Sequence, residues 1–180
     1  MWCGRSIVAK NRQARFCSSK CRVYAHRNPL PKALTVADRW VRWKVVIRDS
    51  RPTKAPLTLA GAFASSTDPR TWTTYAKASA STVGAGLGFV LGDGFSCIDL
   101  AHCLVNGVPT DAAAQFLEAH QGHHIEISPS GHGLHVWGTA EPGPGTVRTQ
   151  DDGLHVERYS TGRYITVTGN VYQRGELLPL

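Results

Sequence analysis

The sequence predicts an α+β fold that follows a short cysteine-containing module. Three observations carry this prediction: strand and helix patterns alternate irregularly after residue 40, glycine-rich turns separate the strands, and cysteines and cations gather before residue 28. The 180 residues suffice for one core and a small attached module, and 42% hydrophobic with 18% charged residues is typical of a globular protein. We therefore expect a cysteine-rich module over 1–27, a linker over 28–35 and a catalytic-type domain over 36–180.

The first module predicts a structural zinc site. Cys3, Cys17, Cys21 and His26 could supply four tetrahedral ligands, and fewer than about 30 residues cannot fold on apolar burial alone. The spacing lacks an opening C-x-x-C pair, so either His26 is the fourth ligand, or the natural start lies upstream and the first cysteine is absent from this sequence. Three unrelated thiols are the competing interpretation.

Charge is distributed unevenly along the chain. Residues 1–54 hold 14 of the 20 lysines and arginines but only two of the 13 acids. Such a basic segment on a mildly acidic body favours a nucleic-acid-binding arm over a merely solubilising surface. The candidate contacts in the cysteine-rich module are Arg12, Arg15, Lys20, Arg22 and Arg27.

No apolar run approaches the length of about 20 residues that would span a membrane, and the N-terminus lacks the apolar stretch of a secretory signal. We expect a cytoplasmic protein without a membrane partner.

The body is expected to follow the order β α β β α β β β β, in one sheet with helices on one face. Alternation predicts a strand over 39–48, followed by a basic turn over 48–56. A helix over 65–81 starts at Thr67 or Asp68 with Pro69 in its first turn, and a second over 110–121 is capped by Thr110. The remaining strands are expected in adjacent pairs, over 83–94 with 95–100, within 123–140, and within 153–169.

Three polar features interrupt these strands. Asp99 lies in an apolar strand, a Ser/Gly loop at 128–133 precedes His135, and Glu157 lies in a later strand. Two opposed carboxylates are suited to Mg²⁺ or Mn²⁺, and a loop of small residues presents N–H groups and hydroxyls to phosphate. Together they predict metal-dependent nucleotidyl transfer.

The segments "GFVLGDGFSCIDLAHCL", "EISPSGHGLHVWG" and "VERYSTGRYITVTG" resemble the three motifs of the primase-polymerase domain of the archaeo-eukaryotic primase superfamily, common in phages and plasmids. "RWVRW", "PTKAP" and "ASSTDPRTWTTY" resemble its N-terminal portion, and "RFCSSKCR" is similar to the zinc-binding heads of phage members. The resemblance implies an RRM-like core beside a smaller α/β unit.

The resemblance also implies roles for individual residues. Asp99 and Glu157 correspond to metal-binding acids, and His135 to the residue that contacts the incoming triphosphate. The nucleotide pocket is expected to include Ser128, Ser130, Gly131, Arg163 and Lys54. The implied partners are a single-stranded DNA template, nucleoside triphosphates and a separate helicase, since no G-x-x-x-x-G-K-[ST] loop occurs in this sequence. A phage- or plasmid-encoded protein would act in the cytoplasm of a bacterial host.

The sequence departs from the family pattern at Ala101, where the first motif has a second aspartate. Residues at i and i+2 share one strand face, so a family member presents two carboxylates there. Three explanations remain open: an inactivating change, a lineage that kept binding without catalysis, or compensation by another acid, either Asp93 or the pair Asp151 and Asp152.

Three other functions compete with this hypothesis. A non-enzymatic nucleic-acid-binding module is favoured by Ala101 and by the basic arm. A nicking enzyme with a similar core needs two histidines on one strand, whereas His132 precedes the strand of His135. A zinc hydrolase would have to use the histidine-rich stretch, which lacks a recognised ligand spacing and comprises His120, His123, His124, His132 and His135.

Overall fold

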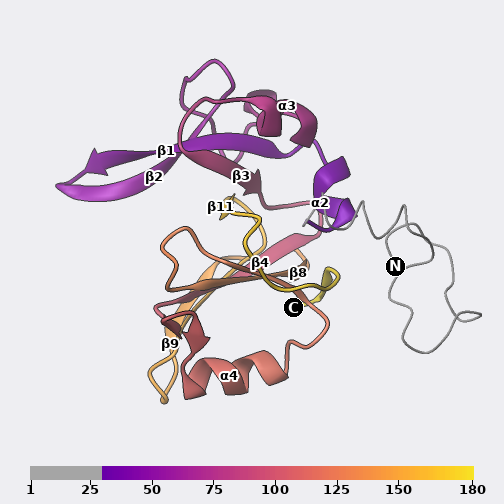
Figure 1. Ribbon diagram of the computed structural model, residues 1–180. Coiled ribbons are helices and arrows are strands. Elements are labelled where there is room, and N and C mark those ends of the chain that lie inside the picture. The colour runs from indigo at the N-terminus through magenta and orange to yellow at the C-terminus, as the bar shows by residue number, and fades with distance from the viewer. Residues whose placement is uncertain (1–29) are drawn as a thin grey trace, which may run out of the picture.

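A computed structural model describes residues 30–180 and shows two antiparallel sheets that face each other (Figure 1). The smaller sheet has the order β11–β3–β1–β2, formed by Tyr164–Val167, Gly86–Val90, Trp40–Arg48 and Arg51–Leu57. The larger sheet has the order β12–β7–β8–β4–β10–β9, formed by Val171–Gln173, His124–Ile127, Leu134–Thr139, Phe95–Ala101, His155–Tyr159 and Thr146–Thr149. The short strand β13 (Leu178–Pro179) pairs in parallel with β8, and β5 (Leu104–Val105) pairs with β6 (Val108–Pro109).

The helices are short and lie outside the space between the sheets. Helix α4 (Asp111–Glu118) covers the face of the larger sheet that points away from the smaller one (Figure 1). Helices α2 (Lys32–Val36) and α3 (Tyr75–Ala80) pack near β1, with the 3₁₀ turn η1 (Pro69–Thr71) just before α3. This mixture of mostly sheet and few helices confirms the predicted α+β class. No helix among the described residues is long and apolar enough to cross a membrane.

Alternation along β4 divides the core and positions the acid. Ile98 and Leu100 point toward α4 and belong to one apolar cluster with Leu117. Cys97 points to the other face, where it joins Phe89 of the smaller sheet in a second cluster. Asp99 lies on the same face as Cys97 because side chains two residues apart in a strand project alike. The register of β4 therefore places Asp99 between the two sheets.

The basic segment expected as a turn over 48–56 is instead mostly strand β2. The turn consists of Asp49 and Ser50 alone, both with positive φ (49° and 60°), which is typical of a tight hairpin. Strand β2 contains Pro52 and Pro56, and it is an edge strand that pairs with β1 only. An edge strand tolerates proline because one side of its backbone needs no hydrogen-bond donor.

Two expected strand pairs are also wrong, because the chain crosses between sheets at both turns. Strands β3 and β4 meet only through a local bridge at Gly92 and Phe95, and they continue into different sheets. Strand β10 pairs with β4, whereas β11 pairs with β3. Each tight turn was identified correctly from its glycines, but sequence alone did not reveal that it connects two sheets rather than two neighbouring strands.

The helix predictions succeed in part. Thr110 caps α4 as expected, its side chain accepting from the Ala113 N–H at 3.3 Å. The helix expected over 65–81 is divided into η1, capped by Asp68, and α3, capped by Thr74. The division arises because Thr73 is extended and pairs with Trp40 of β1. The predicted linker overlaps α2, whose Leu34 is fully buried.

The zinc ligands Cys3, Cys17, Cys21 and His26 lie outside the described residues. The candidate contacts of the basic arm lie there too, namely Arg12, Arg15, Lys20, Arg22 and Arg27.

Candidate nucleotide-binding cleft

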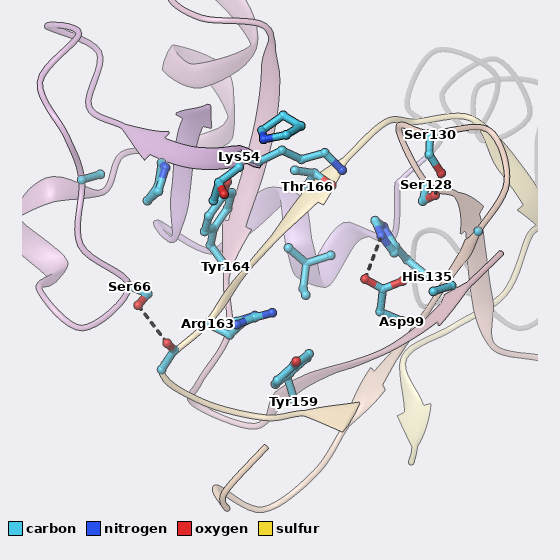
Figure 2. Close-up of a pocket in the computed structure, with 18 of the residues that line it drawn as sticks. Lys54, Ser66, Asp99, Ser128, Ser130, His135, Tyr159, Arg163, Tyr164 and Thr166 are labelled. Carbon is cyan, nitrogen blue, oxygen red and sulfur yellow. Dashed lines mark hydrogen bonds and ion pairs between the residues drawn. The ribbon is translucent and has the colours of Figure 1, made fainter. Parts of the chain in front are cut away.

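A cleft of about 900 Å³ opens between the two sheets (Figure 2). The larger sheet and its loops contribute most of the predicted polar groups, and the smaller sheet contributes Arg48, Lys54 and Tyr164 from the opposite side. Seven of the positions singled out from the sequence line it: Lys54, Asp99, Ala101, Ser128, Ser130, His135 and Arg163. Gly131 and Glu157 lie beside the cleft without lining it.

The polar row on the larger sheet is a direct consequence of strand register. Glu126 of β7 pairs with His135 of β8, His135 pairs with Asp99 of β4, and Asp99 pairs with Glu157 of β10. Directly opposed residues of antiparallel strands project from the same face with Cβ atoms about 5 Å apart. Four strands thus place three carboxylates and one imidazole side by side.

Asp99 and His135 form the part of this row that faces the cleft. The His135 Nε2 lies 3.9 Å from Asp99 Oδ2, and the Asp99 side chain is 34% exposed (Figure 2). The other ring nitrogen of His135, Nδ1, lies 3.4 Å from Glu126 Oε1. The imidazole is almost fully buried, so its orientation is fixed by these neighbours.

Glu157 is surrounded by partners from its own strand and the following turn. Tyr159 donates its hydroxyl proton to Glu157 Oε2, His155 Nε2 lies 3.3 Å from Oε1, and Arg163 Nη2 lies 3.7 Å from Oε2. Burial, with the hydrogen bond to Glu157, raises the pKa of Tyr159 to about 12. The Arg163 guanidinium stacks over the Tyr159 ring, with Cζ 4.4 Å from the ring centroid.

Ala101 lies two residues after Asp99 on β4, at the position where the primase-polymerase motif that the sequence resembles has its second carboxylate. Its partner across the β4–β10 register is His155, which contacts both Thr149 and Glu157. Asp93 is not near this position, because it precedes the other end of β4 and pairs there with Arg39. Asp151 and Asp152 lie in the β9–β10 turn and do not line the cleft.

The Ser/Gly loop between β7 and β8 holds two hydroxyls beside His135. Ser128 Oγ and Ser130 Oγ lie 3.0 Å apart, and Ser130 Oγ accepts the His132 N–H at 3.2 Å. Gly133 allows the loop to pack on β4, because a Cβ there would lie 2.7 Å from the Leu100 carbonyl oxygen. Gly131 has a φ of 77°, so it forms the turn of the loop and does not line the cleft.

The smaller sheet forms the opposite side of the cleft. Lys54 extends into the cleft from β2, while Tyr164 and Thr166 of β11 line it nearby (Figure 2). Burial raises the pKa of Tyr164 to about 12. A hydrogen bond of 2.8 Å from Ser66 Oγ to the Gly162 carbonyl joins the loop before η1 to the β10–β11 turn at the cleft edge.

Sequence reasoning missed Glu126, Tyr159, Tyr164 and Thr166. The first had a usable signal: Glu126 is an acid in the apolar stretch "HIEI", two residues before Ser128, the same pattern that identified Asp99. The other three had none, because Tyr159, Tyr164 and Thr166 reach the cleft only when β10 and β11 join different sheets.

The histidine-rich stretch does not form a metal site in the described part of the chain. No three His, Cys, Asp or Glu side chains among residues 30–180 converge on a common ion position. His120 Nδ1 bonds the Phe116 carbonyl at 2.8 Å and its ring stacks on Phe116. Burial lowers the pKa of His124 to about 4, which keeps it neutral. Within residues 30–180 these histidines are therefore not gathered into the ligand set that a zinc hydrolase would need.

Comparison with known proteins finds that the chain is similar to a phage protein. A DNA primase-polymerase of Nitratiruptor phage NrS-1 is 43% identical over 155 residues, which cover 80% of this chain and 21% of that protein. The chain therefore spans about a fifth of the length of this relative. No family model matches the chain.

Proposed function

We propose that this chain carries out template-dependent nucleotidyl transfer in DNA replication, as primer synthesis, primer extension or both. The observation that carries the proposal is the juxtaposition of Asp99, Glu157 and His135 on one sheet face, beneath a cleft with cations on its opposite side. The similarity to a phage DNA primase-polymerase supports it. The proposal includes the RRM-like assignment of the larger sheet.

The cleft residues, together with Glu157 beside the cleft, would each bind a different part of a nucleoside triphosphate with Mg²⁺ or Mn²⁺. Asp99 and Glu157 would hold the cation, a donor set that suits hard ions which also bind phosphate oxygens. When bound, such a cation neutralises phosphate charge and polarises the reacting phosphoryl group. His135 Nε2 and the hydroxyls of Ser128 and Ser130 would contact the triphosphate, and Lys54 and Arg163 would complement its charge.

The donor set is incomplete by one carboxylate, because Ala101 contributes none. Magnesium is commonly held by one or two carboxylates together with substrate phosphates, so the remaining pair fits a metal–nucleotide complex. A site for two metal ions needs more carboxylate ligands than this pair. Loss of one such ligand lowers the reaction rate by a factor on the order of 10²–10⁴. We therefore propose an enzyme whose chemical step is impaired at Ala101 while nucleotide binding persists.

The β1–β2 hairpin provides a surface for the single-stranded template. Strand β3 pairs with β1 only over Trp40–Trp43, so the hairpin continues beyond Lys44 as a free two-stranded ribbon (Figure 1). Within the described residues its four exposed cations form no ion pair with an acid: Lys44, Arg48, Arg51 and Lys54. Phe63 is 60% exposed beside the Lys44 ammonium, and such aromatic–basic surfaces bind single strands by stacking and charge.

The remaining partners belong to the same proposal. The N-terminal module would bind Zn²⁺ through Cys3, Cys17, Cys21 and His26 and add a second nucleic-acid contact. Unwinding would come from a separate replicative helicase. A phage- or plasmid-encoded protein of this kind would act in the bacterial host cytoplasm.

Primer synthesis and primer extension on a single-stranded template, with Mn²⁺ or Mg²⁺, test the proposal. The chain is compared with Ala101→Asp, which restores the second carboxylate, and with Glu157→Ala. We expect Ala101→Asp to raise the rate by a factor on the order of 10²–10⁴, and Glu157→Ala to abolish product in either background. Asp111→Ala on α4, which also removes one acid but lies away from the cleft, serves as the control.

The alternative favoured by Ala101 is a catalytically inactive replication module that binds nucleotide and nucleic acid. In that case none of the variants makes product, whereas metal-dependent nucleotide binding and template binding both remain measurable by fluorescence anisotropy. Product from the parent chain that Glu157→Ala removes would exclude this alternative.

A further inference from the structure

Glu126 is a buried carboxylate to which the proposed function assigns no role. Its side chain is fully inaccessible to solvent, on β7 between two neighbours of the apolar core. An ionised carboxylate in such a place is costly unless hydrogen-bond donors surround it. The hydrogen-bond partners of the Glu126 carboxylate indicate which role this residue has.

The two oxygens of Glu126 have different partners. Oε2 accepts the backbone N–H groups of Thr168 and Gly169, at 3.2 and 3.0 Å, in the turn between β11 and β12. Gly169 adopts a φ of 68°, a conformation that suits glycine and that aims its N–H at the carboxylate. The Thr168 hydroxyl donates to the Ile127 carbonyl at 2.7 Å and fixes the same turn. Oε1 is left to face His135 Nδ1 at 3.4 Å.

The imidazole of His135 thus lies between two carboxylates with unequal roles. Glu126 is rigidly held and buried, and it meets Nδ1; Asp99 is partly exposed, and it meets Nε2 at 3.9 Å. A carboxylate that accepts from one ring nitrogen fixes both the ring plane and the proton on that nitrogen. Nε2 is then the nitrogen that remains for a ligand in the cleft.

We propose that Glu126 is a positioning residue for His135: it accepts the proton of Nδ1 and holds the ring with Nε2 toward the cleft, where the ring, carrying a proton on each nitrogen, donates from Nε2 to the phosphates of the incoming nucleotide. The identity of the ligand rests on the proposed function, whereas the orientation of the ring does not. The competing role for Glu126 is purely structural, as a link between β7 and the β11–β12 turn. A structural link would affect the fold without affecting His135 in particular.

Nitrogen NMR of the histidine rings in the full chain tests the orientation without any ligand. At a pH where His135 is neutral, we expect its proton on Nδ1, and we expect Glu126→Gln to move it to Nε2 because the amide can donate to Nδ1. The control is Glu118→Gln, the same substitution at an exposed position of α4, which should leave the His135 signals unchanged. A parent chain with the proton on Nε2 would overturn the proposal, even if Glu126→Gln failed to fold.

Nucleotide affinity then separates positioning from structural support. The ligands are adenosine and deoxyadenosine triphosphate with Mn²⁺, each titrated into the parent, Glu126→Gln, His135→Ala and the double variant. Glu126→Gln leaves a neutral ring, whose bond to phosphate lacks the charge-assisted part, so we expect binding to weaken roughly 10–100-fold in the parent background and less than about twofold when His135 is absent. Equal losses in both backgrounds would show a structural link and refute positioning. A parent chain that binds neither nucleotide would contradict the proposed function, and the ring signals would still decide the role of Glu126.

Discussion

The two sheets contribute to the cleft in opposite ways. The larger sheet supplies acids and an imidazole from the centre of four paired strands, where register fixes every neighbour. The smaller sheet supplies cations from its edge, where the β1–β2 ribbon continues beyond its last pairing with β3. The larger sheet thus forms a rigid, negatively charged side of the cleft. The smaller sheet forms a positively charged side from which the β1–β2 ribbon projects.

This difference suits the two kinds of ligand that we propose. Metal binding needs carboxylates held within fractions of an ångström, and paired strands provide that precision. A polynucleotide has a regular charge but no fixed shape, so a projecting ribbon with long cationic side chains can follow it. We therefore expect small changes of packing or protonation in the larger sheet to lower folding stability and nucleotide affinity. Changes to the β1–β2 ribbon should affect only the binding of nucleic acid.

The largest expected effect is acid destabilisation of the larger sheet through His124. Burial lowers its pKa from 6.5 to about 4, with opposing effects of Glu126, which raises it, and Arg174, which lowers it further. Between these two values the unfolded chain binds a proton that the folded chain does not. Folding stability is therefore complete above about pH 6.5 and falls as the pH drops toward about 4, by a total of roughly 3 kcal/mol.

Urea unfolding at pH 7.5 and pH 5 measures this loss. The variant His124→Leu cannot titrate at this position, so its free energy of unfolding should change less between the two pH values than that of the parent. An identical change in both proteins would mean that His124 does not keep its low pKa in the folded chain.

A smaller effect is expected from Gly133→Ala in the Ser/Gly loop. The added Cβ would lie 2.7 Å from the Leu100 carbonyl oxygen and 2.9 Å from Ser128 Oγ, so the loop must move away from β4. Overpacking of this kind costs about 1–3 kcal/mol, and it displaces the Ser128 hydroxyl that we assign to phosphate. Thermal unfolding should show the loss of stability, and nucleotide titration the loss of affinity.

Gly143→Ala is the matched control, since a Cβ at Gly143 meets nothing within 4 Å and its φ is unrestricted. If Gly133→Ala and Gly143→Ala lost equal stability, the prediction would be wrong, because the Ser/Gly loop would then not be packed against β4 as tightly as the structure shows.

Sequence reasoning located the acidic side of the cleft better than the basic side. Asp99, His135 and the Ser/Gly loop could be identified because polar residues interrupt apolar strands there. This pattern is visible in the amino-acid sequence alone. Glu126 carried the same signal in "HIEI" and was overlooked. The order of the strands could not be predicted, since the turns at Gly92–Gly94 and Ser160–Arg163 connect two sheets while resembling ordinary hairpin turns.

The β1–β2 ribbon was missed for a different physical reason, although Lys54 was expected in the nucleotide pocket. The segment 48–56 was expected to be a turn, and its prolines at 52 and 56 are compatible with a strand only because β2 pairs with a single neighbour. Whether a strand lies at an edge depends on contacts distant in sequence. The ribbon, and the position of Lys54 opposite Asp99, therefore emerge only from the assembled sheets.

The smallest expected effect concerns the ribbon, and it distinguishes the two sides of the cleft most directly. The variant carrying Lys44→Ala and Arg51→Ala removes two exposed cations that pair with no acid in the described part of the chain. Each phosphate contact on a single strand contributes about 0.7 to the slope of log affinity against log salt, so loss of two contacts should lower the slope for a single-stranded oligonucleotide by about 1.4. Lys77→Ala on α3 controls for the loss of surface charge.

Nucleotide affinity and folding stability should remain those of the parent, because neither Lys44 nor Arg51 lines the cleft. An unchanged salt slope would place the template elsewhere, whereas a parallel loss of nucleotide affinity would show that ribbon and carboxylates act as one unit.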